Sequence, residues 1–328
     1  MNALDLGGEP LYDRARVVDT FAHWQGPRIR QSRDVRGFPG YVQFTNRRIH
    51  ADAMARNIPS GSGVLEIGPG AGAYTKVLAA LGCTIVAGDV SPVQLEHHRA
   101  AVGRSPAERA VEARHELDVV DLPFPDASFD AVTCLGGPIS YVFDHGARAM
   151  TELLRVVKPG GPVLVSVMSQ GWVNTFARQL WDRGVIDMKD AGDIEGSGDL
   201  RHPAIGSGAH QFRGYTRNRL DALIRRTGAE PESAIASWAG PPPRRAAQWS
   251  TYLERCRSLA ILDHTSGYLL AVTHRPGAEF ARGYGGPLDR EDLDHLLLRN
   301  EPVPSVTRAG VVTQALRSRR FPPSSRGD

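Results

Sequence analysis

Apolar residues along this chain gather in short runs that alternate with segments of helical periodicity. Four apolar runs have the length of a buried strand, at residues 64–67, 84–88, 129–135 and 163–167. A further apolar run ends at Leu117 and Asp118. Strands that alternate with helices are typical of a doubly wound α/β fold, whose sheet is mostly parallel. The pattern therefore predicts that architecture.

The two ends of the chain and one internal stretch depart from this alternation. Residues 1–60 combine an arginine-rich lead-in with a helical pattern, so we expect an N-terminal helical cap. Residues 168–215 are rich in Gly, Asp and Trp and too long for an ordinary connection, which favours a lid or a substrate-binding insertion. We expect the main domain to cover residues 61–275, including this insertion. A C-terminal extension, partly helical and then flexible, is expected at 276–328.

Two predicted helices carry signals at their first residues. Ser91 precedes Pro92 and stands three residues before Gln94, a spacing typical of a capping box in which the two polar side chains satisfy each other's backbone amides. Asp144 precedes the next helical pattern, so we expect its carboxylate to cap that helix.

Composition narrows the class of protein. Hydrophobic residues make up 41% of the 328, but none of the apolar runs reaches the roughly 20 residues needed to cross a bilayer. The N-terminus lacks a basic segment followed by an apolar stretch, so we expect a cytoplasmic protein. A net charge of +3 is too small to favour a nucleic-acid partner. We expect a small-molecule substrate and no membrane partner. The sequence is also compatible with a homodimer.

The cysteines give no sign of a metal or a disulfide framework. Cys83, Cys134 and Cys256 are far apart, odd in number and match no CxxC spacing. We interpret them as buried or half-buried thiols and expect no metal site.

A glycine-rich turn between a predicted strand and a predicted helix is the main candidate site. It runs from Glu66 to Gly72, and glycines there allow the backbone to approach a ligand closely. Gly68, Gly70 and Ala73 also fit the dinucleotide pattern GxGxxA, and Asp89 lies 21 residues beyond Gly68, where a ribose-binding acid belongs. An NAD-dependent oxidoreductase is therefore an alternative at this point.

Glu66 favours a different ligand. A carboxylate at the end of a buried strand is costly without a partner, and it would repel a pyrophosphate. It would attract an ammonium group instead. S-adenosylmethionine has a cationic amino group and a sulfonium and no phosphate, so the turn favours S-adenosylmethionine over NAD.

Four motifs in order carry a family resemblance. They are Glu66 to Gly72, the acid at Asp89, the segment 117–130 with its "DLPFPDASFD" sequence, and the segment 154–161, "LRVVKPGG". On these motifs the chain resembles, over about residues 40–275, the class I S-adenosylmethionine-dependent methyltransferases of the ubiquinone/menaquinone-biosynthesis-like type. The resemblance implies a mostly parallel, doubly wound seven-stranded sheet.

The resemblance also implies which residues contact S-adenosylmethionine. Asp89 would hold both ribose hydroxyls, with Val90 beside the adenine. Asp118 would accept from the adenine amino group, and the Val119 amide would contact a ring nitrogen. The remaining cofactor residues implied are Glu66, Gly68, Gly70, Gly72 and Leu135.

Methyl transfer requires an aligned acceptor and, for a hydroxyl or an amine, removal of a proton. Ligands of doubly wound sheets lie outside the carboxyl ends of the strands, so the acceptor should meet residues 135–141 and the insertion. Our candidate bases are His210 and Tyr141, with His145 and His202 as weaker alternatives. Relatives often carry a His-His pair where this chain has Ser140 and Tyr141, so this sequence departs from the family at the base.

The expected function is methyl transfer to O, N or C of a small molecule. A composition with 35 Gly and 23 Pro makes bacterial specialised metabolism a hypothesis for its setting. Two alternatives share the fold: aminocarboxypropyl transfer or cyclisation by S-adenosylmethionine chemistry, and a non-catalytic protein that binds S-adenosylmethionine.

Overall fold

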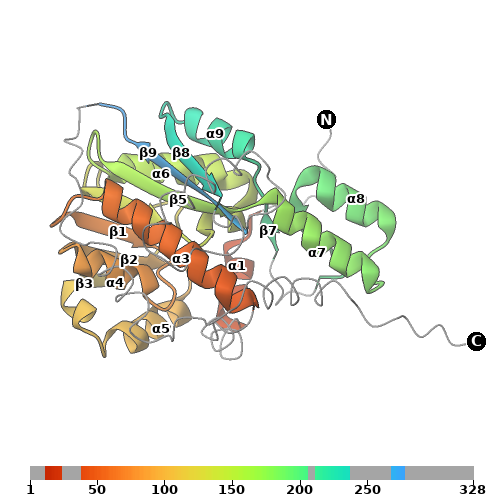
Figure 1. Cartoon of the computed structure of the whole chain (residues 1–328), viewed down its shortest axis with the longest axis horizontal. Helices are drawn as coiled ribbons and strands as arrows, with labels where there is room; N and C mark the ends of the chain where they lie inside the picture. Colours follow the sequence, from red (N-terminus) through yellow and green to blue (C-terminus); the bar gives the residue numbers. More distant parts are fainter. Residues whose placement is uncertain (1–11, 24–37, 206–210, 237–266, 278–328) are drawn as a thin grey trace, which may run out of the picture.

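A seven-stranded sheet forms the centre of the computed structural model, which describes residues 12–23, 38–205, 211–236 and 267–277 (Figure 1). The strand order is β3-β2-β1-β4-β5-β9-β8. All pairings among the first five strands are parallel, whereas β9 is antiparallel to both β5 and β8. The predicted fold class is confirmed. The strands are β1 (Gly63–Ile67), β2 (Thr84–Asp89), β3 (Val111–Glu116), β4 (Ala131–Cys134), β5 (Pro162–Met168), β8 (Pro231–Ala236) and β9 (Tyr268–His274).

Helices cover both faces of this sheet because successive strand residues point to opposite sides. Val64 of β1 packs in one apolar core with Met54 and Leu78, which lie on α3 (Phe38–Asn57) and α4 (Ala73–Ala80). Leu65, the next residue, packs in the other core with Met150 of α6 (Gly146–Val156) and residues of α9 (Arg217–Arg225). The two cores together bury the sheet on both faces.

Helix α1 (Arg14–His23) lies across the carboxyl ends of β2 and β3. Arg14 contacts Glu116 at the end of β3, with 2.8 Å between Nη2 and Oε1. Gln94 of α5 (Pro92–Val102) donates from Nε2 to the backbone oxygen of Phe21 at 2.9 Å. These contacts attach the N-terminal segment to the edge of the sheet where ligands of such folds bind.

The insertion after β5 is mostly helical and extends away from the sheet (Figure 1). It contains α7 (Gln170–Asp182), α8 (Met188–Ser197) and a two-stranded sheet of β6 (Asp199–Leu200) and β7 (Phe212–Arg213). Its two ends are joined, because Tyr215 N donates to Met168 O at 2.8 Å and Gln170 N donates to Tyr215 O at 2.9 Å. Within it, Arg213 donates to both oxygens of Asp199, at 2.6 and 2.7 Å.

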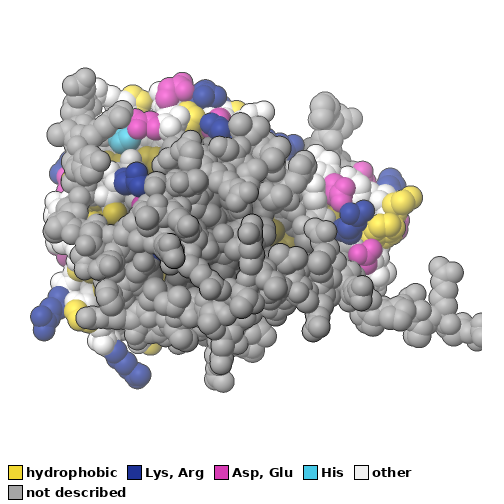
Figure 2. Space-filling view, in the orientation of Figure 1, with side chains coloured by type: hydrophobic (Ala, Val, Ile, Leu, Met, Phe, Trp, Pro, Cys, Tyr) yellow, Lys and Arg dark blue, Asp and Glu magenta, His cyan; other side chains and the backbone are white. Residues whose placement is uncertain are grey.

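The outer end of the α7–α8 pair exposes apolar side chains. Figure 2 shows them among acidic and basic neighbours on the face in view. Exposed fractions are 40% for Trp181, 40% for Val185 and 71% for Met188. None of the helices that the structure describes combines the length and the apolar character needed to cross a membrane.

Both predictions of a side-chain cap at a helix start are wrong. Ser91 is the residue before α5, as predicted, but its side chain makes no capping bond, and Gln94 bonds to Phe21 instead of to Ser91. The helix expected to start at Asp144 begins at Gly146, after a 3-10 turn (η3, Phe143–His145), and has no side-chain cap.

Smaller differences concern a strand end and the cysteines. The third strand ends at Glu116, before the predicted Leu117 and Asp118. Cys83 and Cys134 are buried free thiols, as predicted. Cys256, His210 and the predicted C-terminal extension beyond residue 277 lie outside the described residues.

Candidate functional site

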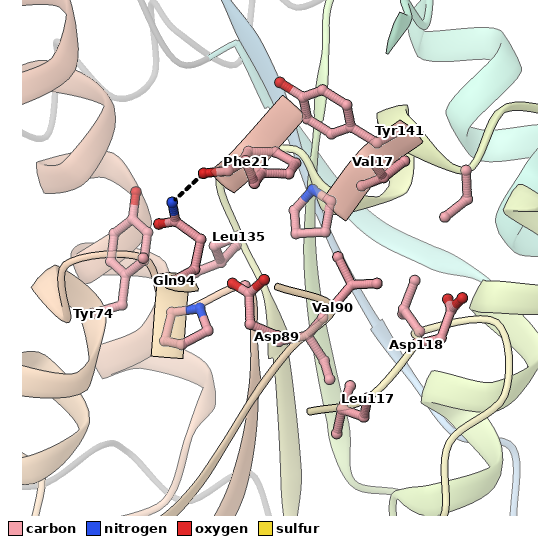
Figure 3. Close-up of a pocket in the computed structure, with 18 of the residues that line it drawn as sticks. Val17, Phe21, Tyr74, Asp89, Val90, Gln94, Leu117, Asp118, Leu135 and Tyr141 are labelled. Atoms are coloured by element: carbon pink, nitrogen blue, oxygen red, sulfur yellow. Dashed lines mark hydrogen bonds between the residues drawn. The ribbon is translucent and has the colours of Figure 1, made fainter. Parts of the chain in front are cut away.

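A pocket opens at the carboxyl ends of the parallel strands (Figure 3). It is bounded by the glycine turn after β1, the ends of β2 and β4, helix α1 and Tyr268 of β9. Of the residues predicted to hold the cofactor, the pocket brings together seven: Gly68, Gly70, Asp89, Val90, Asp118, Val119 and Leu135. The predicted base Tyr141 also lines it.

The glycine turn needs backbone angles that favour glycine. Gly68 and Gly70 have φ of +67° and +51°, in the left-handed region, and both line the pocket. Gly72 has φ +74° and immediately precedes α4, but it does not line the pocket. A Cβ there would lie 2.1 Å from Val102 Cγ2, so Gly72 allows α4 to pack closely on α5.

Asp89 ends β2 and reaches the pocket with 8% of its surface exposed. Its Oδ1 accepts a hydrogen bond from Ser91 N at 2.9 Å, which fixes the carboxyl group at the turn. Burial raises the pKa of Asp89 from 3.8 to about 6, although backbone amides oppose the shift. A donor from a ligand would favour the ionised form.

Asp118 already has partners for both carboxylate oxygens. Val120 N donates to Oδ1 at 3.1 Å, and the hydroxyl of Tyr12 donates to Oδ2. Each carboxylate oxygen has a further lone pair, so the predicted adenine contact can be made beside these two bonds. Sequence reasoning missed Tyr12, because nothing in residues 1–60 shows which sheet edge the N-terminal segment covers.

Glu66 does not line the pocket, contrary to the interpretation that its carboxylate faces the ligand. It is 2% exposed, beneath the glycine turn, and accepts from Thr75 Oγ1 at 2.7 Å. Its other oxygen, Oε1, has no hydrogen-bond partner among the described residues. Burial raises the pKa of Glu66 from 4.5 to about 7, although the bond from Thr75 opposes the shift.

A chain of hydrogen bonds extends from Glu66 to the surface. Arg114 Nε donates to His98 Nδ1 at 2.9 Å, so the proton of this neutral imidazole is on Nε2. His98 Nε2 lies 2.8 Å from Thr75 Oγ1, whose own proton points to Glu66. Arg114 also pairs with Glu108. Each donor in the chain therefore points toward Glu66.

Aromatic side chains from three parts of the chain form an aromatic wall of the pocket. Phe21 of α1 packs edge-on against Tyr141, with ring centroids 4.9 Å apart at 70°. Tyr141 is 4% exposed and belongs to the short turn η2 (Pro138–Tyr141). Tyr268 of β9 packs on Trp172 of the insertion at 5.4 Å. The sequence placed only Tyr141 at this site, because the other rings come from distant segments.

The remaining base candidates differ in position. His145 does not line the pocket, although its ring centroid is 5.2 Å from that of Tyr12. His202 is in the insertion, where Nε2 lies 3.1 Å from Asp190 Oδ2, and it does not line the pocket either. The structure therefore leaves Tyr141 as the predicted base that reaches the pocket among the described residues.

Known proteins resemble this chain in sequence and in fold. Residues 65–165 match the family model described as "Methyltransferase domain". Together with the sheet order, this match makes that part of the chain a class I S-adenosylmethionine-dependent methyltransferase domain. S-adenosylmethionine is the cofactor of this class of domain.

Two curated methyltransferases are similar to parts of this chain. The demethylmenaquinone methyltransferase of Clavibacter sepedonicus is 39% identical over 110 residues, which are 34% of this chain and 42% of that protein. The 2-methyl-6-phytyl-1,4-hydroquinone methyltransferase of Synechocystis is 31% identical over 208 residues, which are 61% of this chain and 58% of that protein. The chain spans about half the length of the curated relatives it matches.

A solved structure has the same fold. A methyltransferase from Methanosarcina mazei superposes with a TM-score of 0.50 at 17% identity, over 69% of this chain and 98% of that one. At this identity the likeness concerns the fold alone.

Proposed function

We propose that this protein transfers the methyl group of S-adenosylmethionine to a small-molecule acceptor. The observation that carries the proposal is the charge distribution of the pocket. Asp89 and Asp118 both line it, and Arg47 of α3 is the one Lys or Arg among its described lining residues. Acids suit the hydroxyls and amino group of a nucleoside, and an arginine suits a carboxylate. A pyrophosphate beside these acids would be disfavoured.

The residues present fit this cofactor. Asp89 would accept from the two ribose hydroxyls, and Val90 would pack beside the adenine. The adenine amino group would donate to Asp118 and the Val119 amide would contact the ring, with Leu135 on the opposite side. Gly70 leaves room for the ligand against the backbone, since nothing lies within 4 Å of a Cβ built on it, whereas a Cβ on Gly68 would lie 2.8 Å from Pro138 Cγ.

When bound, S-adenosylmethionine supplies a methyl group on a sulfonium, an activated group for direct displacement. The protein's own part is to align the acceptor and exclude water. Phe21, Tyr141 and Tyr268 form an apolar wall that does both. Tyr141 and His210 are the residues we propose for proton removal.

We further propose that the acceptor is an aromatic ring that carries hydroxyl groups. The names of the relatives from Clavibacter and Synechocystis refer to quinone and hydroquinone methylation. A wall of aromatic side chains suits a flat aromatic acceptor, because offset-stacked and edge-on ring pairs are favourable. A setting in bacterial specialised metabolism stays a prediction.

Calorimetry and product analysis test the proposed function. S-adenosylhomocysteine should bind, and NAD and NADP should show no measurable heat. Incubation with S-adenosylmethionine and hydroquinones should release S-adenosylhomocysteine. Release of methylthioadenosine would indicate aminocarboxypropyl transfer instead, and binding without any product from a broad acceptor panel would favour the non-catalytic alternative. Tight NAD binding without a response to S-adenosylhomocysteine would overturn the proposal.

The role of Tyr141 has its own test. If its phenolate removes the acceptor proton, Tyr141→Phe should lower kcat by about 10²-fold or more, the usual range for a general base. The affinity for S-adenosylhomocysteine should stay unchanged, since the cofactor residues are elsewhere. A raised KM with an unchanged kcat would instead assign Tyr141 to acceptor binding.

A further inference from the structure

Helix α3 places a buried histidine against a tyrosine of the pocket. His50 is fully buried, and its Nδ1 lies 2.6 Å from the hydroxyl oxygen of Tyr74 on α4. Tyr74 lines the pocket, whereas His50 lies behind it. The other ring nitrogen of His50, Nε2, is buried without a hydrogen-bond partner among the described residues. The imidazole is therefore directed at Tyr74.

Because Nε2 of His50 has no described hydrogen-bond partner, it indicates where the protons of the His50–Tyr74 pair lie. Burial lowers the pKa of His50 to about 3, so the ring is neutral and carries one proton. A proton on Nε2 would be a buried donor without an acceptor, and orphaned N–H groups are rarer than orphaned acceptors. The proton is therefore on Nδ1 and is donated to Tyr74. Burial also raises the pKa of Tyr74, so the phenol keeps its own proton and can donate it to another group.

Within the pocket, Tyr74 lies on the side away from Asp118. Figure 3 shows Tyr74 and Asp118 at opposite sides of the view, with Asp89 between them. Arg47 also lines the pocket and stands three residues before His50, on the same face of α3. Its positive charge acts on the Tyr74 hydroxyl, against the negative charge of Glu66. A hydroxyl donor and a guanidinium together form a site for an anionic group.

We propose that Tyr74, oriented by His50 and assisted by Arg47, binds the carboxylate at the amino-acid end of the cofactor. The inference rests on the proposed function. A nucleoside held by Asp118 and Asp89 directs the rest of an extended ligand along the glycine turn toward Tyr74. Tyr74 is then a binding residue, and His50 is a positioning residue that acts through it.

Two ligands that differ in one group test this assignment. S-adenosylhomocysteine has the carboxylate, and S-adenosyl-3-thiopropylamine keeps the amine but lacks the carboxylate. In calorimetry, Tyr74→Phe should weaken S-adenosylhomocysteine binding about tenfold or more, as expected for a hydrogen bond to a charged group. The affinity for S-adenosyl-3-thiopropylamine should stay within about twofold. Tyr215→Phe, which removes a buried hydroxyl outside the pocket, is the matched control and should change neither affinity.

Variants of His50 test its positioning role. His50→Leu should reproduce most of the loss for S-adenosylhomocysteine alone, and His50→Asn, whose amide can donate in place of Nδ1, should restore it. Equal losses for both ligands in Tyr74→Phe, or no loss for either, would overturn the inference. Failure of the unmodified protein to bind either ligand would instead overturn the proposed function. Circular dichroism and thermal unfolding of each variant separate loss of binding from loss of folding.

Discussion

Asp89 lies in the pocket and has a raised pKa, so its effect on cofactor binding should depend on pH. The ribose hydroxyls would donate to its ionised form, and charge-assisted hydrogen bonds are the stronger ones. Because burial raises the pKa of the free carboxyl to about 6, affinity for S-adenosylhomocysteine should increase as the pH rises from 5 to 7 and then level off. Asp89→Asn should weaken binding at least tenfold at pH 7.5 and flatten this pH profile, as measured by calorimetry. A profile of equal slope in the variant would mean that another group titrates.

Gly72 should be more sensitive to substitution than a glycine with nearly the same backbone angle. Gly61 has φ +80° and open space where a Cβ would lie, whereas a Cβ on Gly72, at φ +74°, meets Val102. Gly61→Ala should therefore cost about 1 kcal/mol of unfolding free energy from backbone strain alone. Gly72→Ala adds overpacking and should cost about 2–4 kcal/mol. Urea unfolding of the two variants gives the difference, and equal losses would show that α4 shifts freely away from α5.

At the level of single residues, the sequence predicted the parts of the site that a local motif determines. Gly68, Gly70 and Asp89 follow from a strand, a turn and a helix adjacent in sequence. The environment of Glu66 could not be derived in this way, because its partner Thr75, and His98 that contacts Thr75, depend on how α4 and α5 pack. The same holds for Tyr12, whose contact to Asp118 joins residues 106 positions apart.

Among the elements, β6 and β7 are joined by one ion pair besides their backbone pairing. Asp199 and Arg213 are 16% and 24% exposed, and their two hydrogen bonds join the only two strands that the structure describes in the insertion. Asp199→Asn should lower the free energy of local opening by about 1–3 kcal/mol, as for other hydrogen bonds to charged groups. Hydrogen exchange should then become faster in β6, β7 and α8 and stay unchanged in β1 and β2.

The matched control for this pair is an exposed ion pair outside the insertion. Arg225 and Glu230 are 54% and 75% exposed, so Glu230→Gln should leave exchange unchanged throughout. Faster exchange across the whole sheet in Asp199→Asn would show that the insertion and the sheet unfold together.

The first residues of α5 and α6 show why the position of a helix was easier to predict than its capping interactions. Pro92 favours the first turn of α5, and the helix begins there. The partner of Gln94 could not be predicted, because Phe21 approaches from 73 residues away. Likewise the apolar spacing located α6, while the 3-10 turn before it moved its start past Asp144.

On the scale of the whole molecule, one buried acid should make stability depend on pH. Burial raises the pKa of Glu66 from 4.5 to about 7, so between these values the folded state holds more protons than the unfolded state. The free energy of unfolding should therefore fall as pH rises from about 4.5 to 7, with Asp89 adding a smaller fall at lower pH. The Glu66 contribution is at most about 3–4 kcal/mol.

Urea unfolding at pH 5 and pH 8 measures this dependence. Glu66→Gln should remove most of the difference between the two values, since a glutamine can still accept from Thr75 but does not titrate. Parallel pH profiles for the protein and the variant would show that the Glu66 carboxyl keeps its ordinary pKa.

The joined ends of the insertion have a consequence for how this fold can diversify. The chain leaves the sheet at Met168 and returns at Tyr215, and these two residues are hydrogen-bonded to each other. A segment whose entry and exit share one attachment point can be lengthened, shortened or exchanged without moving the strands that carry Asp89 and the glycine turn. None of the described residues of the insertion lines the pocket, so cofactor binding should tolerate such changes. A chimera that receives residues 170–214 from a relative should therefore keep its own affinity for S-adenosylhomocysteine.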